Sequence, residues 1–273
     1  MATFGQIIFA SMITLIVIFS ALIILILALS LSGTLSEVIS TNTLPVANLG
    51  EDQLLSCFLS TKGQPAGLTD VAVTWEKTGL TGLVYRYQNG ALDLADQNSQ
   101  FKGRTQLFLD ALTTGNASLL LRGVARSDEG EYTCSISSSG GGGKVNIYLR
   151  TAAFSAPTFK FTNGTLAAEA SRWFPKPNVT WSNYDRLILP GNTSFTSNSA
   201  GIFSVVSTLQ SINVSDTYTC RMENDLVTGI STVTVAGTDV SGNTYFTYSA
   251  ASSLPTSTYL SLTTSVLYIY YVT

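Results

Sequence analysis

Histidine is absent from this chain of 273 residues, and cysteine occurs only three times. The absence of histidine excludes Ser-His and Cys-His nucleophiles, histidine metal sites and histidine-based pH sensing. Three cysteines are too few for a disulfide-dense scaffold or a four-cysteine zinc site. We therefore expect no metal site and no cofactor.

Charged residues are also scarce. Lys, Arg, Asp and Glu make up 11% of the chain, and the net charge is −3. The first charged residue is Glu37 and the last is Asp239, so both ends of the chain are uncharged. Because no basic cluster is present to neutralise phosphates, nucleic acid is not an expected partner.

The uncharged N-terminal end is one apolar run over residues 7–31, followed by small residues. This pattern is typical of secretory targeting, and Ala28 and Ser30 have the spacing of a signal-peptidase site. A run of about 20 apolar residues is also long enough to span a bilayer. We expect residues 1–32 to be either a cleaved signal peptide or a retained signal anchor.

The C-terminal end, residues 241–273, is a weaker membrane signal. Its most apolar stretch is only Val266–Val272, and no basic residue follows to fix an orientation. A lipid-anchor signal fits equally well, with small residues at 249–251, a polar spacer and an apolar tail. We expect a C-terminal membrane or lipid-anchor segment, with a disordered tail as the alternative.

Five Asn-x-Ser/Thr sequons lie between the two ends. Together with the targeting segment, they indicate the secretory pathway and the external side of the plasma membrane. The expected N-glycosylation sites are Asn116, Asn163, Asn178, Asn192 and Asn213.

The middle of the chain has short strand-like segments separated by turn residues, spaced about 8–12 residues apart, which is typical of all-β sandwiches. The length allows two domains. We expect an all-β protein with two tandem immunoglobulin-like sandwiches, a variable-type domain over residues 37–150 and a constant-type domain over 154–236. Residues 82–94 have room for the two extra strands that distinguish the variable type.

The first sandwich contains Cys57, Trp75 and "DEGEYTC" (128–134) in the order of a variable-type domain. We expect a disulfide between Cys57 and Cys134. Because this bridge restricts the unfolded chain, it is expected to raise the free energy of unfolding by about 4–5 kcal/mol. Trp75 is expected to pack on this bridge, and Tyr132 has the position of the tyrosine corner.

The second sandwich lacks one of its two expected cysteines. Ala168 occupies the position of the first, which leaves Cys220 as a buried, unpaired thiol. In the first sandwich, we expect Arg104 and Asp128 to form an ion pair. The core anchors expected in the two sandwiches are Trp75, Tyr132, Arg104, Asp128, Trp181 and Tyr218.

Several runs of residues carry a family resemblance: "NLGEDQLLSC", "FKGRTQLFLD", "TGNASLLLRGV", "RWFPKPNVTW" and "YTCRMEND". The chain resembles the B-seven, butyrophilin-related group of T-cell co-signalling ligands. The resemblance implies a membrane-anchored ligand whose partner is a protein receptor on activated T cells, and which restrains proliferation and cytokine output. The alanine at position 168 departs from the family pattern.

A docking surface follows from strand alternation, because inward Trp75 and Cys134 set the phase of their strands. Tyrosines are enriched at interface cores, so two tyrosines are the expected aromatic anchors. A slip of one residue would present Val84 and Arg86 instead. The expected receptor-binding face consists of Thr74, Glu76, Tyr85, Tyr87, Thr133 and Ser135. "SSSGGGGK" (137–144) is expected to be a flexible turn at the tip of the domain.

An enzymatic function has little support. Asp93, Asp96 and Asp110 are possible acid/base groups, but placement in turns and edge strands explains them better. We expect neither catalysis nor a small-molecule substrate. The main alternative to a co-inhibitory ligand is an adhesion or decoy protein of the same fold, because a fold does not fix a function.

Overall fold

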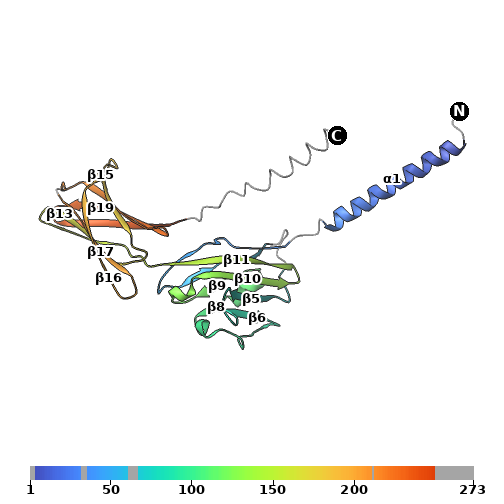
Figure 1. Ribbon diagram of the computed structural model, residues 1–273, viewed down its shortest axis with the longest axis horizontal. Coiled ribbons are helices and arrows are strands. Elements are labelled where there is room, and N and C mark those ends of the chain that lie inside the picture. Colours follow the sequence, from blue (N-terminus) through green and yellow to red (C-terminus); the bar gives the residue numbers. More distant parts are fainter. Residues whose placement is uncertain (1–3, 32–35, 61–66, 211, 250–273) are drawn as a thin grey trace. The chain divides into compact units, whose positions relative to one another are not determined.

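The computed structural model describes residues 4–31, 36–60, 67–210 and 212–249. Helix α1, Phe4–Leu31, contains the N-terminal apolar run (Figure 1). Its side chains from Ser11 to Leu27 are exposed. Over the described residues, no helix meets the length and hydropathy of a membrane span. The assignment of residues 1–32 to targeting or anchoring stays a prediction.

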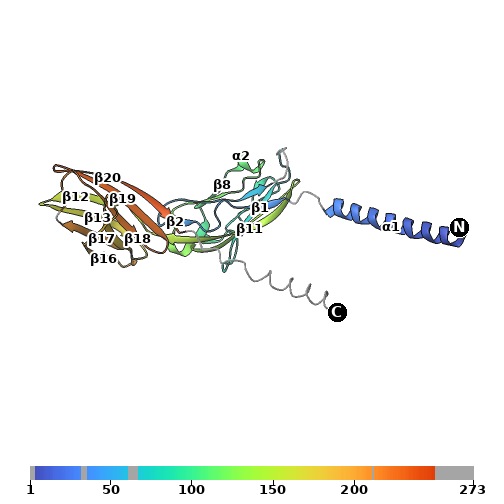
Figure 2. The same cartoon turned by 90° about the horizontal axis from the view of Figure 1, so that it is seen from above.

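In the rest of the described chain the regular secondary structure is almost entirely β-strand, and the chain divides into two compact units. The variable-type sandwich contains strands β1 to β11, and the constant-type sandwich contains strands β12 to β20 (Figures 1 and 2). The predicted all-β fold with two tandem immunoglobulin-like sandwiches is confirmed.

The variable-type sandwich has a front sheet in the order β2-β11-β10-β5-β6-β7 and a back sheet in the order β3-β9-β8, with β1 paired to β4. Strands β6 and β7 are the two extra strands predicted within residues 82–94. The strands are β1 Glu37–Ile39, β2 Val46–Asn48, β3 Gln53–Leu55, β4 Phe58–Ser60, β5 Ala72–Lys77, β6 Tyr85–Gln88, β7 Ala91–Leu92, β8 Thr105–Leu107, β9 Leu119–Leu121, β10 Gly130–Ser138 and β11 Gly141–Ala152. The short helices are η1 Ser99–Phe101, α2 Leu109–Leu112 and η2 Arg126–Asp128.

The core of this sandwich is built around one disulfide. Cys57 on the back-sheet side is bonded to Cys134 of β10. Trp75 is fully buried opposite Cys134 in the β5–β10 register, and its indole N–H donates to the Ala117 carbonyl at 3.0 Å. The hydrogen bond satisfies the only polar group of the indole, so the ring is buried without an unpaired donor.

The glycine-rich segment 137–144 is not a long flexible loop. Strand β10 continues to Ser138 and β11 begins at Gly141, so the turn itself is short. The amide of Gly142 donates to Ser36 Oγ at 3.1 Å, and a Cβ on Gly143 would lie 3.4 Å from Val38 Cγ2. Glycine occurs here because the N-terminal strand packs directly against the β11 backbone.

The constant-type sandwich pairs a sheet in the order β12-β13-β17-β16 with a sheet in the order β15-β14-β18-β19-β20. Its strands are β12 Thr158–Thr162, β13 Thr165–Trp173, β14 Asn178–Asn183, β15 Ile188–Leu189, β16 Gly191–Ser197, β17 Phe203–Gln210, β18 Thr217–Glu223, β19 Val227–Ala236 and β20 Asp239–Tyr248. Trp181 of β14 lies opposite Cys220 of β18, which repeats the Trp75–Cys134 pairing of the first sandwich.

The position of the missing cysteine is part of the core. Ala168 of β13 and Cys220 of β18 are both fully buried in one hydrophobic cluster, and Cys220 is a free thiol. Burial raises the pKa of the Cys220 thiol to about 12. Trp181 is anchored by its indole N–H, which donates to Ser207 Oγ at 2.9 Å. This cluster therefore holds the two sheets together by packing rather than by a covalent bond.

Strand β20 extends the second sandwich beyond its predicted end at residue 236. It pairs antiparallel with β19 along its whole length, from Asp239 to Tyr248 (Figure 2). Phe246 of this strand packs on Phe154, with 5.0 Å between ring centroids. The first part of the predicted C-terminal anchor segment is thus a strand of the sandwich, and residues 250–273 lie outside the described residues.

Candidate functional site

The outer face of the front sheet brings together four of the predicted docking residues. In the register of β5 and β10, Thr74 lies opposite Ser135 and Glu76 lies opposite Thr133. Glu76 is exposed and the other three side chains are half-buried. Cross-strand neighbours of this kind form one continuous surface.

The side chains of strand β6 alternate in the opposite sense to the predicted one, which placed Tyr85 and Tyr87 on the outer face. Tyr85 lies opposite Trp75, and Tyr87 lies opposite Val73, so both tyrosines are on the inner face. Tyr85 is 5% exposed, and burial raises the pKa of its phenol. Neither residue is therefore an exposed aromatic anchor.

The alternative, a slip of one residue that presents Val84 and Arg86 on the outer face, is correct for Arg86 only. Arg86 lies opposite Thr74 and is on the outer face, whereas Val84 is buried. The reason is that the chain enters β6 irregularly: the amide of Val84 donates to the Trp75 carbonyl before regular pairing begins. Such an irregularity shifts the alternation that sequence alone assumes to be strict.

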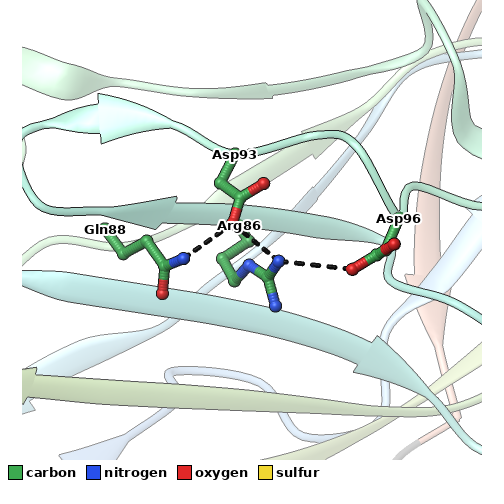
Figure 3. A network of polar contacts seen from close by, with 4 residues as sticks. All are labelled: Arg86, Gln88, Asp93 and Asp96. Carbon is green, nitrogen blue, oxygen red and sulfur yellow. Dashed lines mark hydrogen bonds and ion pairs between the residues drawn. The ribbon is translucent and has the colours of Figure 1, made fainter.

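Arg86 is the centre of a polar network (Figure 3). Its Nη2 lies 2.6 Å from Asp93 Oδ2 and 3.5 Å from Asp96 Oδ2. Gln88 Nε2 donates to the same Asp93 oxygen at 2.6 Å. Asp93 therefore holds Arg86 closely, and Asp96, whose side chain is 73% exposed, is the weaker partner. Asp93 and Asp96 are ion-pairing residues in this arrangement.

Beside this network is an open, shallow hollow with about 780 Å³ of accessible space, which we call the charged hollow. Its charged lining residues are Glu76, Arg86 and Asp96. Within the described part of the chain, the Glu76 carboxylate has no ion pair. The full lining consists of Glu76, Leu80, Thr81, Gly82, Leu83, Arg86, Ala95, Asp96, Gln97 and Asn98.

The walls of the charged hollow are fixed by hydrogen bonds of the backbone. The amide of Leu83 donates to the Asp96 carbonyl at 2.9 Å, and the amide of Asn98 donates to the Leu83 carbonyl at 2.9 Å. Gly82 has φ +85°, and a Cβ there would lie 2.6 Å from the Asp96 carbonyl oxygen. The close approach of the two segments requires glycine at this position.

A second polar chain lies toward β11. Thr133 Oγ1 donates to Asn146 Oδ1 at 3.0 Å, and Asn146 Nδ2 donates to Glu131 Oε1 at 3.0 Å. Tyr148, also on β11, is 46% exposed. Sequence reasoning missed Asn146 and Tyr148, although counting alternate residues along 144–150 would have placed them outside.

The sequons are unevenly distributed over the two sandwiches. Four of the five asparagines belong to the constant-type sandwich and are exposed: Asn163, Asn178, Asn192 and Asn213. Asn116 lies before β9 of the back sheet and is half-buried. Strands β5, β6, β10 and β11 contain no sequon. The outer face of the front sheet is therefore free of attached glycan on its own strands.

The remaining predicted residues are core anchors, and they take part in packing and hydrogen bonds within the sandwiches. Tyr132 is fully buried, and Tyr218 accepts a hydrogen bond from the Asn213 amide at 2.8 Å. Asp128 is buried and accepts from the Ala125 amide at 2.8 Å. Arg104 donates to the Gln100 and Arg122 carbonyls. The expected ion pair of Arg104 with Asp128 stays a prediction.

Comparison with known proteins gives the class of the molecule. The immunoglobulin V-set domain profile matches residues 41–149. With the disulfide and the strands β6 and β7, this match defines an immunoglobulin-superfamily protein with a V-set domain, followed by a second immunoglobulin-like sandwich.

The similarity extends beyond the V-set domain. V-set domain-containing T-cell activation inhibitor 1 of Rattus norvegicus is 37% identical over 252 residues, which cover 88% of this chain and 87% of the relative. The Homo sapiens protein of the same name is 36% identical over the same shares. The solved human B7-H4 IgV-like domain is 36% identical and covers 42% of this chain and 96% of its own, with a TM-score of 0.38. The chain belongs to the family of V-set domain-containing T-cell activation inhibitor 1.

Proposed function

We propose that the chain is a cell-surface co-inhibitory ligand, which binds a protein receptor on activated T cells and lowers their proliferation and cytokine production. The observation that carries the proposal is the similarity to T-cell activation inhibitors over most of both chains. A binding role rather than an enzymatic one is supported by the V-set fold.

The docking surface is the outer face of the front sheet, centred on the charged hollow. Two observations support it. The face combines charged and polar side chains with an open, shallow hollow, and the backbone hydrogen bonds beside this hollow order its lining before binding, which lowers the entropy lost on binding. The strands that form it also lack sequons, so glycans do not start from within the face.

The surface location rests on the apolar N-terminal run and the five sequons. We propose that residues 1–32 direct the chain into the secretory pathway. N-terminal sequencing of the mature protein distinguishes cleavage near residues 30–33 from retention. Phospholipase treatment of intact cells, with release of the protein as the readout, distinguishes a lipid anchor from other attachment.

The proposed function is tested with cells that display the full chain beside a T-cell-receptor stimulus. We expect lower proliferation and cytokine output of T cells than with matched cells lacking the chain. Adhesion of T cells without any inhibition would instead favour the adhesion or decoy alternative. Unchanged proliferation, with the disulfide-bonded chain present on the surface, would contradict the proposal.

A further inference from the structure

Acidic side chains outnumber basic ones in the lining of the charged hollow. Three charged side chains line it, and two of these, Glu76 and Asp96, are acidic. The single cation, Arg86, is already engaged by Asp93 at 2.6 Å, a carboxylate that is itself only partly exposed. Glu76 is exposed and has no ion pair among the described residues, and Asp96 is only loosely paired with Arg86 and is 73% exposed, so these two carboxylates are the charges most accessible to an incoming group.

The positions of these two carboxylates favour an incoming cation. Asp96 is 3.5 Å from Arg86 and mostly exposed, so it is able to pair with a second cation without breaking the Arg86–Asp93 pair. Glu76 is exposed and comes from β5, whereas Asp96 comes from the segment after β7. A cation in the hollow would thus meet carboxylates from two separate elements.

The apolar part of the lining fits the same kind of group. Leu80, Leu83 and Ala95 line the hollow together with the carboxylates. Lysine and arginine have aliphatic stems that pack on apolar surface while their charged heads interact with polar groups. A side chain with both parts matches the mixed lining better than a small ion would.

We infer that the charged hollow receives a lysine or arginine side chain from the protein receptor, and that Glu76 and Asp96 bind its cationic head. The inference rests on the proposed function. Because opposite charges across an interface steer association and exclude wrong partners, this contact would contribute to specificity. The expected receptor therefore has an exposed basic side chain on its surface, which projects into the open hollow beside β5 and β6.

The variants that test this inference leave the walls of the hollow in place. The hydrogen bond across the hollow uses the backbone carbonyl of Asp96, not its side chain. The charge reversals Glu76→Lys and Asp96→Lys therefore change the charge without removing that contact. Asp110→Lys is the matched control, because Asp110 is an exposed carboxylate of α2 outside the hollow. The milder pair Glu76→Gln and Asp96→Asn removes charge without reversing it.

The experiment measures adhesion of activated T cells to cells that display each full-length variant at equal surface density. Formation of the Cys57–Cys134 disulfide, read by gel mobility with and without reductant, verifies folding. We expect the double reversal to lower adhesion about tenfold or more. The neutral pair should give a smaller decrease, and Asp110→Lys should bind as the unmodified chain does.

The possible outcomes distinguish a failure of the inferred basic contact from a failure of the proposed co-inhibitory function. Equal adhesion by the double reversal and the unmodified chain would overturn the inference and leave the proposed function standing. Equal loss with Asp110→Lys would overturn it as well, because the effect would then follow overall charge. Adhesion that requires the same chain on both cells would identify a second copy as the occupant. Failure of the unmodified chain to bind any T cell would overturn both.

Discussion

At the scale of single residues, the second sandwich differs from the first at one decisive position. Ala168 and Cys220 are both fully buried in the same cluster, in which a disulfide partner for Cys220 is missing. The high pKa of the Cys220 thiol keeps it protonated and unreactive at physiological pH. The sandwich therefore depends on aromatic and aliphatic packing where its neighbour has a covalent bond.

Restoring the missing cysteine should stabilise the second sandwich. Ala168→Cys would allow a disulfide with Cys220 across a loop of about 50 residues. Because the bond restricts the unfolded chain, it should raise the free energy of unfolding by about 4 kcal/mol. Chemical denaturation should show the transition of the second sandwich at a higher denaturant concentration than in an Ala168→Ser variant, and reduction of both proteins should remove this difference. The control is Ala168→Ser, which cannot form the bond. Two titratable thiols in the oxidised, denatured variant would contradict the prediction.

Gly82 offers a second test at this scale. Gly82→Ala places a Cβ against the Asp96 carbonyl, whereas Gly79→Ala, at a similar φ of +81°, meets nothing within 4 Å. Both substitutions strain a left-handed backbone, but only the first also crowds the hollow. We expect a loss of about 1 kcal/mol of unfolding free energy for Gly79→Ala and about 2–4 kcal/mol for Gly82→Ala. Equal losses in thermal unfolding would show that the close approach is unimportant.

Sequence patterns predicted the residues of the site to different degrees. Alternation placed Thr74, Glu76, Thr133 and Ser135 together, because Trp75 and Cys134 fix the phase of two regular strands. It misplaced Tyr85 and Tyr87, because no anchor in β6 marks the inner face and the strand begins irregularly. The charged hollow was not predictable, because residues 76, 86 and 96 meet only through tertiary pairing.

At the scale of elements, β20 is the unexpected feature. The sequence marks a turn after β19 at Gly237, which has φ +65°, but the low charge of the following residues suggested the beginning of an anchor. Instead, Val240, Thr244 and Phe246 face inward in alternation, and Phe246 and Val240 pack on the core cluster. This strand adds apolar burial to the sandwich that lacks a disulfide.

The contribution of β20 is measurable with one pair of variants. Phe246→Ala removes a ring that packs on Phe154, and we expect a loss of about 2 kcal/mol of unfolding free energy. Tyr245→Ala is the neighbouring control, because Tyr245 is 54% exposed, and its effect should be within about 0.5 kcal/mol. Equal effects in chemical denaturation would mean that β20 does not support the core.

At the scale of the whole molecule, the two sandwiches have different surfaces. The exposed sequon asparagines belong to the constant-type sandwich, and the front sheet of the variable-type sandwich has a charged hollow and no sequon. The fold and disulfide were predictable because cysteine, tryptophan and tyrosine mark fixed positions in immunoglobulin strands. The uneven distribution of the sequons between the sandwiches emerges only when they are mapped onto the strands.

We propose that the front sheet of the variable-type sandwich is the inhibitory surface, and a glycan placed on this sheet tests the proposal most directly. Ser135→Asn creates a sequon with Ser137 on β10, and Asp239→Asn creates a control sequon with Ser241 on the constant-type sandwich. The measurement is T-cell proliferation against cells displaying each glycosylated variant at equal density. We predict that Ser135→Asn abolishes inhibition and that Asp239→Asn retains it. Full inhibition by a Ser135→Asn chain whose new glycan is verified by glycosidase digestion would contradict the account.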